Sequence, residues 1–208
     1  MRWLVLALMV LGSGFAMAQT AVEMTPETIA QSSAAMIVQA SISGWADRTL
    51  PEGGLLREYT LQTIGGYGEV IPFQIGLKTR AGQAFVERVT LSYGPGAWTP
   101  AVFRNFLELA RVLSAGCFQA TSTDLSNSMS LLFQGAAAIL SRGQASGGAG
   151  TGRLVGRYSG SSLANGMLDL TLELSTSATP ATAGPWKSYC TLGKRPEGPN
   201  GSSHWTTV

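Results

Sequence analysis

The sequence predicts an α+β fold. In this fold a mainly antiparallel sheet, built from a three-strand meander, a hairpin and a short C-terminal strand, packs against two amphipathic helices, with one disulfide. Residues 54–93 alternate apolar and polar side chains between glycine-rich turns. Residues 100–142 repeat apolar side chains at helical spacing, and alternation returns over residues 152–175. Strands, then helices, then strands are typical of α+β folds rather than of alternating α/β or all-β folds.

The meander is predicted as strands at 55–63, 69–78 and 84–93, joined by Gly65-Gly66-Tyr67-Gly68 and by Arg80-Ala81-Gly82. These turns carry glycine where the chain must reverse, and the alternation on either side of them indicates strands with one buried face.

The register of the last two meander strands follows from a three-residue turn, which predicts Leu77 opposite Phe85. The apolar side chains that then share one buried face are Ile71, Phe73, Ile75, Leu77, Phe85, Val89 and Leu91. Pro72 points to the other face and has no N–H to donate. Its strand is therefore predicted to lie at an edge or to be bulged there.

Two amphipathic helices are predicted after the meander. Thr99-Pro100 has the order of an N-cap and a first-turn proline, and the helix runs to Gly116. The next helix runs from Asp124 to Arg142-Gly143. The side chains expected to face the core are Val102, Phe103, Phe106, Leu107, Ala110 and Leu113, and then Leu125, Met129, Leu132, Phe133, Ala136, Ile139 and Leu140.

A helix is also predicted over residues 26–42, because Thr25-Pro26-Glu27 combines an N-cap, a first-turn proline and an acid matched to the helix dipole. Residues 144–152 are rich in glycine and are predicted to form a flexible loop.

The hairpin is predicted as strands 152–160 and 166–175, with Tyr158 opposite Leu168. That register places Arg157 opposite Asp169 and Arg153 opposite Glu173 on the polar face. The arginines are therefore predicted to be neutralised across the strands rather than to form an anion site.

The first 18 residues predict a signal peptide. Arg2 is followed by the apolar stretch Trp3–Leu11, which is too short to cross a membrane, and then by Ala16-Met17-Ala18 as a cleavage site before Gln19. The expected location is therefore periplasmic or secreted, with no transmembrane segment after signal cleavage.

The remaining chain predicts a single α+β domain over residues 19–192 and a disordered tail over residues 193–208. Within the domain, residues 176–185 are a Thr/Ala/Pro linker and residues 186–192 a short last strand.

Two cysteines are present, Cys117 and Cys190. In an oxidising compartment they are expected to form a disulfide, and free buried thiols are the alternative. A bridge closing about 74 residues contributes about 4 kcal/mol in the chain-entropy model.

Charge and composition exclude several function classes. Lys and Arg number 14, Asp and Glu 12, and the net charge is +2 without a basic block, which argues against a nucleic-acid partner. The single histidine, His204, lies near the C-terminus, so no His-based metal site or Ser-His-Asp triad is expected. No motif indicates a cofactor, a metal or a catalytic residue.

Three residues are candidates for binding. Arg57 and Glu87 flank Ile75 on neighbouring strands and are predicted to form a partly buried ion pair, with a site carboxylate held by Arg57 as the alternative. Trp98 lies beside a loop, where an aromatic side chain contributes either to a binding surface or to the core.

These observations favour an exported, non-catalytic binding or accessory protein of the bacterial envelope, acting on a protein partner or a small molecule. The alternatives are a small extracytoplasmic hydrolase that uses carboxylate, Ser or Tyr groups, and a structural envelope component.

Overall fold

The computed structural model describes residues 22–24, 28, 40–118, 120, 122–151, 154–163, 167–176 and 190–193. The predicted signal peptide and nearly all of the predicted tail lie outside the described residues, as does most of the helix predicted over 26–42.

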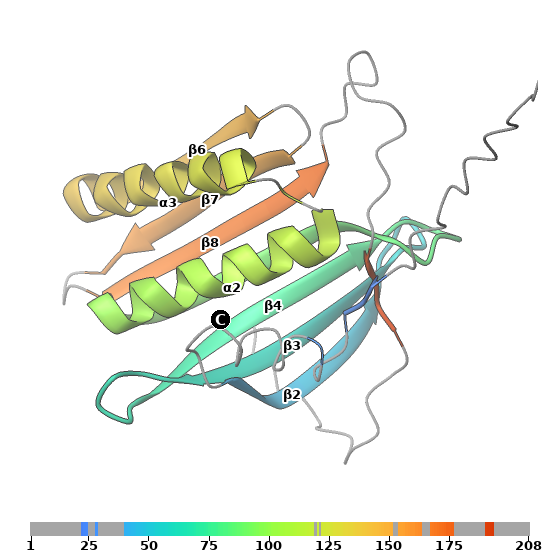
Figure 1. Cartoon of the computed structure of the whole chain (residues 1–208), viewed down its shortest axis with the longest axis horizontal. Helices are drawn as coiled ribbons and strands as arrows, with labels where there is room; N and C mark the ends of the chain where they lie inside the picture. The colour runs from blue at the N-terminus through green and yellow to red at the C-terminus, as the bar shows by residue number, and fades with distance from the viewer. Residues whose placement is uncertain are drawn as a thin grey trace, which may run out of the picture.

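One seven-stranded antiparallel sheet forms the body of the molecule, in the order β2-β3-β4-β5-β8-β7-β6 (Figure 1). Its strands are β2 (Ala40–Thr49), β3 (Leu55–Ile64), β4 (Val70–Thr79), β5 (Val86–Ala97), β6 (Gln144–Thr151), β7 (Leu154–Ser162) and β8 (Met167–Thr176). The predicted α+β class and antiparallel sheet are confirmed, and the sheet is larger than predicted.

Two helices, α2 (Pro100–Phe118) and α3 (Ser122–Arg142), lie on the same face of this sheet (Figure 1). Both confirm the predicted helices. In α2, Thr99 Oγ1 accepts a hydrogen bond from the Val102 amide (3.2 Å), as an N-cap does. Among the described residues, no helix combines the length and the apolar character of a membrane span.

The core lies between the sheet and the helices. It takes Phe73, Leu77, Val89 and Leu91 from the meander and the leucines of β8, and packs them against Phe106, Leu109 and Leu113 of α2. Alternation in the strands and helical spacing in α2 therefore bury one face of each element, as the sequence predicts.

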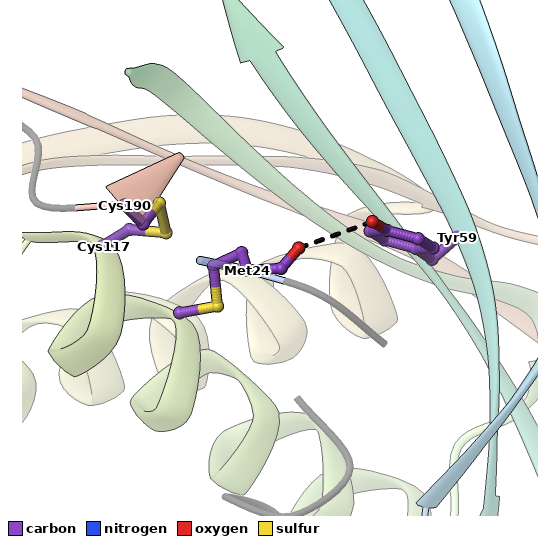
Figure 2. The surroundings of a disulfide bond; sticks show 4 residues. All are labelled: Met24, Tyr59, Cys117 and Cys190. Carbon is purple, nitrogen blue, oxygen red and sulfur yellow. Dashed lines mark hydrogen bonds between the residues drawn. A yellow bond between two sulfur atoms is a disulfide. The ribbon is translucent and has the colours of Figure 1, made fainter. Parts of the chain in front are cut away.

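A second, two-stranded parallel sheet pairs β1 (Val22–Glu23) with β9 (Cys190–Thr191). Cys190 is bonded to Cys117 at the end of α2, which confirms the predicted disulfide (Figure 2). Thr191 bridges Phe85, just before β5, so the C-terminal strand is tied to both α2 and the sheet.

The predicted register between β4 and β5 is wrong by four residues. Leu77 pairs with Val89 rather than with Phe85, because the connection continues through Phe85 and a bulge follows at Thr79. An even shift keeps each side chain on its face, so Val89 and Leu91 are still buried. Phe85, predicted to be core, is 42% exposed.

The prediction that the strand of Pro72 lies at a sheet edge or is bulged there is wrong. β4 is an interior strand, but its pairing with β5 begins at Gln74, so the ladder does not need an N–H from Pro72 on that side. Pro72 pairs with Gln62 of β3.

The predicted β7–β8 register is also wrong by four residues, because β7 continues to Ser162 through residues that predicted a turn. Tyr158 faces Leu172, and Arg157 faces Glu173 instead of Asp169. The Glu173 carboxylate accepts a hydrogen bond from Arg88 of β5 (3.0 Å), and Arg153 lies outside the described residues.

Two strands replace other predicted structures. Residues 40–42, predicted as the end of a helix, begin β2. Residues 144–151, predicted as a flexible loop, form β6 along β7. In β6 the glycines give space to a neighbour, since a Cβ at Gly147 would lie 2.8 Å from the Tyr158 ring.

The inward face of α3 is narrower than predicted. Leu132, Ala136 and Ile139 are buried, whereas Met129, Phe133 and Leu140 are 37%, 52% and 53% exposed. The helix carries more apolar side chains than one face can bury, so the surplus reaches the surface.

Candidate functional site

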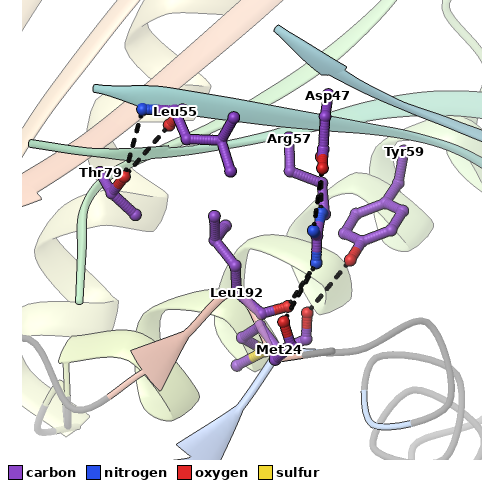
Figure 3. A network of polar contacts seen from close by, with 8 residues as sticks. Met24, Asp47, Leu55, Arg57, Tyr59, Thr79 and Leu192 are labelled. Atoms are coloured by element: carbon purple, nitrogen blue, oxygen red, sulfur yellow. Dashed lines mark hydrogen bonds and ion pairs between the residues drawn. The ribbon is translucent and has the colours of Figure 1, made fainter. Parts of the chain in front are cut away.

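Arg57, a candidate binding residue, lies in a buried polar cluster (Figure 3). Its Nε and Nη2 donate to the two carboxylate oxygens of Asp47, at 2.7 and 3.0 Å, and Nη1 donates to the Leu192 carbonyl oxygen at 2.8 Å. The side chain is 3% exposed and its guanidinium lies 5.7 Å from the Trp45 ring centroid. Arg57 therefore joins β2, β3 and the end of β9.

Burial lowers the pKa of Arg57, but its hydrogen bonds to the Asp47 carboxylate and its electrostatic interactions with Tyr59 and Asp47 together outweigh burial, so the pKa lies above its ordinary value. Close by, the Tyr59 hydroxyl donates to the Met24 carbonyl oxygen at 3.4 Å (Figures 2 and 3). These contacts hold the short β1–β9 sheet against β3.

The predicted ion pair between Arg57 and Glu87 does not form. Glu87 accepts a hydrogen bond from Arg80, whose side chain is 72% exposed, in the β4–β5 connection. Arg57 faces Leu77, and Leu77 faces Val89, so Glu87 lies two positions along β5 from the residue aligned with Arg57. Arg57 pairs instead with Asp47 of β2, a strand that the sequence did not predict.

Trp98, the third candidate, belongs to a chain of aromatic rings at the start of α2. Its ring centroid lies 5.8 Å from those of Tyr93 and Phe103 and 6.1 Å from that of Phe106. Edge and tilted contacts of this kind stabilise a core, and Trp98 packs against the main core. Phe103 continues the chain of rings to Phe133 of α3, at 4.5 Å.

Tyr93 makes this cluster sensitive to alkaline pH. Burial raises the pKa of its phenol, whose hydroxyl donates to the Ala97 carbonyl oxygen at 2.8 Å. Because the pKa is raised by folding, the stability that this group contributes is complete below its unfolded-state pKa of about 10 and is lost as pH rises through the folded-state value.

We expect Tyr93→Phe to lower the free energy of unfolding by about 1 kcal/mol at neutral pH, since one hydrogen bond is lost. It should also remove part of the alkaline loss of stability. Urea unfolding at a series of pH values from about 9 upward tests this, with wild type as reference. Parallel curves for the two proteins would contradict the prediction.

One end of the sheet collects exposed apolar side chains. The strand pairings bring together four connections there: the β3–β4 turn, the β5–α2 and α3–β6 links and the β7–β8 turn. Five of the eight large exposed hydrophobic side chains among the described residues lie in or beside these connections: Ile64, Tyr67, Val70, Leu140 and Leu163. We call these five residues the apolar rim. All five therefore lie toward the same end of the sheet.

Tyr67 is the most prominent residue of the rim, because its side chain is fully exposed at the apex of the β3–β4 turn. The turn is nevertheless ordered. The Tyr67 amide donates to a Glu69 carboxylate oxygen (2.9 Å), the Gly65 amide to the Glu69 carbonyl oxygen (2.8 Å), and the Gly68 amide to the Gly65 carbonyl oxygen (3.1 Å). Gly68 has φ +80°, which glycine adopts without strain.

The base of this turn is anchored to α2. Asn105 is 1% exposed, and its Nδ2 donates to Thr63 Oγ1 at 2.9 Å and to the Ile64 carbonyl oxygen at 3.4 Å. The aromatic side chain at the tip is therefore presented on a rigid support. The sequence identifies Gly65-Gly66-Tyr67-Gly68 only as a turn. The available signal for an exposed apolar surface is that Ile64 and Val70 occupy outward positions of the strand alternation, where polar side chains are expected.

Two surface depressions lie outside the apolar rim. One, of about 410 Å³, lies on the strands β6, β7 and β8, and its polar lining includes Ser146, Arg157, Ser159, Thr171 and Glu173. The other, of about 510 Å³, lies beside the β1–β9 sheet near Arg80 and Gln83. Over the described part of the chain, no group of His, Cys, Asp and Glu side chains is arranged to hold a metal ion.

Comparisons of the chain with known protein families, with curated proteins and with solved structures find no match. The geometry of the surface is therefore the basis for a functional proposal.

Proposed function

We propose that this chain is an exported, non-catalytic binding or accessory protein of the bacterial envelope that docks a protein partner through the apolar rim. The observation that carries the proposal is Tyr67, fully exposed yet held by an ordered turn between Ile64 and Val70. Tyrosine is among the residues that dominate protein interfaces, because it buries a large area with few rotatable bonds.

Rigidity of the tip supports the same function. A loop that is already ordered loses little conformational entropy on binding, so more of the contact energy contributes to affinity. The partner that fits is a protein with an apolar pocket for one aromatic side chain, because the rim residues are apolar and Tyr67 adds one hydroxyl.

Export is supported by the signal-like residues 1–18 and by the disulfide between Cys117 and Cys190, since disulfides persist in oxidising compartments.

A photo-crosslinking amino acid at position 67, in the native host, tests the function. We expect one discrete protein adduct, which weakens when Val70→Ser is added because the apolar contact area is reduced. The matched control places the same amino acid at Gln83, an exposed position in the β4–β5 connection at the other end of the sheet. Identical adducts from both positions, lipid adducts alone, or none at all would each contradict a protein-docking rim.

With the crosslinked partner purified, Tyr67→Ser is expected to weaken binding by about 30-fold, which corresponds to about 2 kcal/mol for an interface anchor. The same substitution should change the free energy of unfolding by less than about 0.5 kcal/mol, because the side chain is fully exposed. Titration calorimetry and urea unfolding measure the two quantities. Unchanged affinity would exclude Tyr67 as the anchor.

A further inference from the structure

β6 is an edge of the main sheet that lacks the features by which edge strands avoid pairing. It contains no charged residue and no proline, and its pairing with β7 runs without a bulge from Gln144 to Thr151. The opposite edge, β2, has an irregularity between Ile42 and Gly44 and carries Asp47 and Arg48. The two edges of the same sheet therefore differ, and no described strand pairs with the outer side of β6.

One hydrogen bond identifies which backbone N–H and C=O groups of β6 point away from β7. The Ser162 amide donates to the Gly143 carbonyl oxygen (2.7 Å), so odd-numbered positions along this stretch direct their backbone groups toward β7. Alternation then directs the N–H and C=O groups of Ser146 and Gly148 away from the sheet. Both residues are exposed, and Ser146 has a small side chain while Gly148 has none, so neither blocks access to the edge.

The side of α3 above this edge is uncharged except at its two ends. Phe133 contacts Phe103, which identifies the side facing α2, and Leu132, Ala136 and Ile139 face the core. The remaining lateral side carries Leu131, which is buried, and Ala138, with Asp124 and Arg142 at its ends and Asn127 and Gln134 toward solvent. Asp124 and Arg142 are 18 positions apart, which is about five helical turns, so they lie on the same side of the helix.

The middle of α3 lies above the middle of β6. A Cβ at Gly135 would be 2.7 Å from the Tyr158 ring and one at Gly147 would be 2.8 Å from it, so one tyrosine separates the two centres. A two-fold axis that lies beside the centre of β6, half a strand spacing outside it, therefore also passes beside the centre of α3.

We propose that the occupant of this edge is a second copy of the chain, related by that two-fold axis. β6 pairs antiparallel with its own copy, with Gly148 opposite Gly148, and the two sheets become continuous. The two α3 helices then run antiparallel, and Asp124 of each copy faces Arg142 of the other.

Two considerations favour a second copy over an unrelated strand. α3 lies over β6 and β7, so strand spacings of about 4.8 Å place the two α3 axes about 10 Å apart, which is a normal helix-packing distance. The charges are also self-complementary, since the antiparallel arrangement brings unlike charges together at both ends and uncharged side chains between them.

Sedimentation velocity of the mature protein, over a concentration series, tests the proposal. We expect a dimer. Asp124→Arg alone and Arg142→Glu alone should each weaken dimerisation by about tenfold or more, because like charges then meet at both ends of the α3 pair. The double reversal should restore the dimer. Restoration cannot arise within one copy, because the two positions are about 27 Å apart along the helix.

A second pair of variants tests the strand. Ser146→Pro removes an outward N–H without removing a bond to β7 and should weaken the dimer, whereas Ser146→Thr keeps the N–H and should not. Circular dichroism and thermal unfolding, measured on every variant, verify that each one is folded. A wild-type monomer at all concentrations, failure of the double reversal to restore the dimer in folded protein, or equal behaviour of the proline and threonine variants would overturn the proposal.

Discussion

Replacing both Cys117 and Cys190 with alanine is expected to lower the free energy of unfolding by about 4 kcal/mol, which is a large part of the stability of a typical domain. The bridge joins residues 73 positions apart and so restricts the unfolded chain strongly. It also holds β9 in place, and with it the Leu192 carbonyl oxygen that accepts from buried Arg57. Urea unfolding followed by tryptophan fluorescence measures the change.

The matched control for this variant is wild-type protein in reductant, which should unfold at the urea concentration of the alanine variant. Both sulfurs are bonded and both residues are fully buried, so reduction and substitution remove the same constraint. A decrease of less than about 1 kcal/mol would show that other contacts alone hold β9.

Asp47→Ala is expected to cost about 3–5 kcal/mol, because it leaves the buried Arg57 guanidinium without its carboxylate. Urea unfolding at neutral pH measures the loss. The double variant Asp47→Leu, Arg57→Met should recover part of it, since two apolar side chains then replace the ion pair and no unpaired buried charge remains.

Glu87→Ala is the matched control, because it breaks an ion pair of the same chemistry at the surface. Arg80 is largely exposed there, so the loss should be below about 1 kcal/mol. Equal losses for Asp47→Ala and Glu87→Ala would mean that burial of Arg57 does not determine the strength of its pair.

These two large effects should not add. The disulfide and Arg57 both hold β9, at Cys190 and at Leu192, and residues that share a structural element couple energetically. A triple variant lacking the disulfide and Asp47 is therefore expected to lose less than the sum of the separate losses.

The candidate site was predictable in part. The chemistry of Arg57 as a buried, paired cation was correct, whereas its partner was not, because Asp47 lies in a strand whose glycine, Gly44, interrupts the alternation at a bulge. Trp98 packs against the core, which is one of the two roles that the sequence predicts for it. Tyr67 was not identified, since its exposure depends on how the β3–β4 turn projects beyond the sheet.

From the sequence alone, the antiparallel meander, both amphipathic helices, the hairpin and the Cys117–Cys190 bridge could be predicted, because local periodicity, capping residues and a single pair of cysteines encode them. Tertiary structure decided the registers, because a shift of an even number of residues leaves every buried face intact and so leaves no trace in the pattern. It also decided that the glycine-rich β6 is a strand, since contacts with β7, Tyr158 and α3 supply the order that its own composition does not.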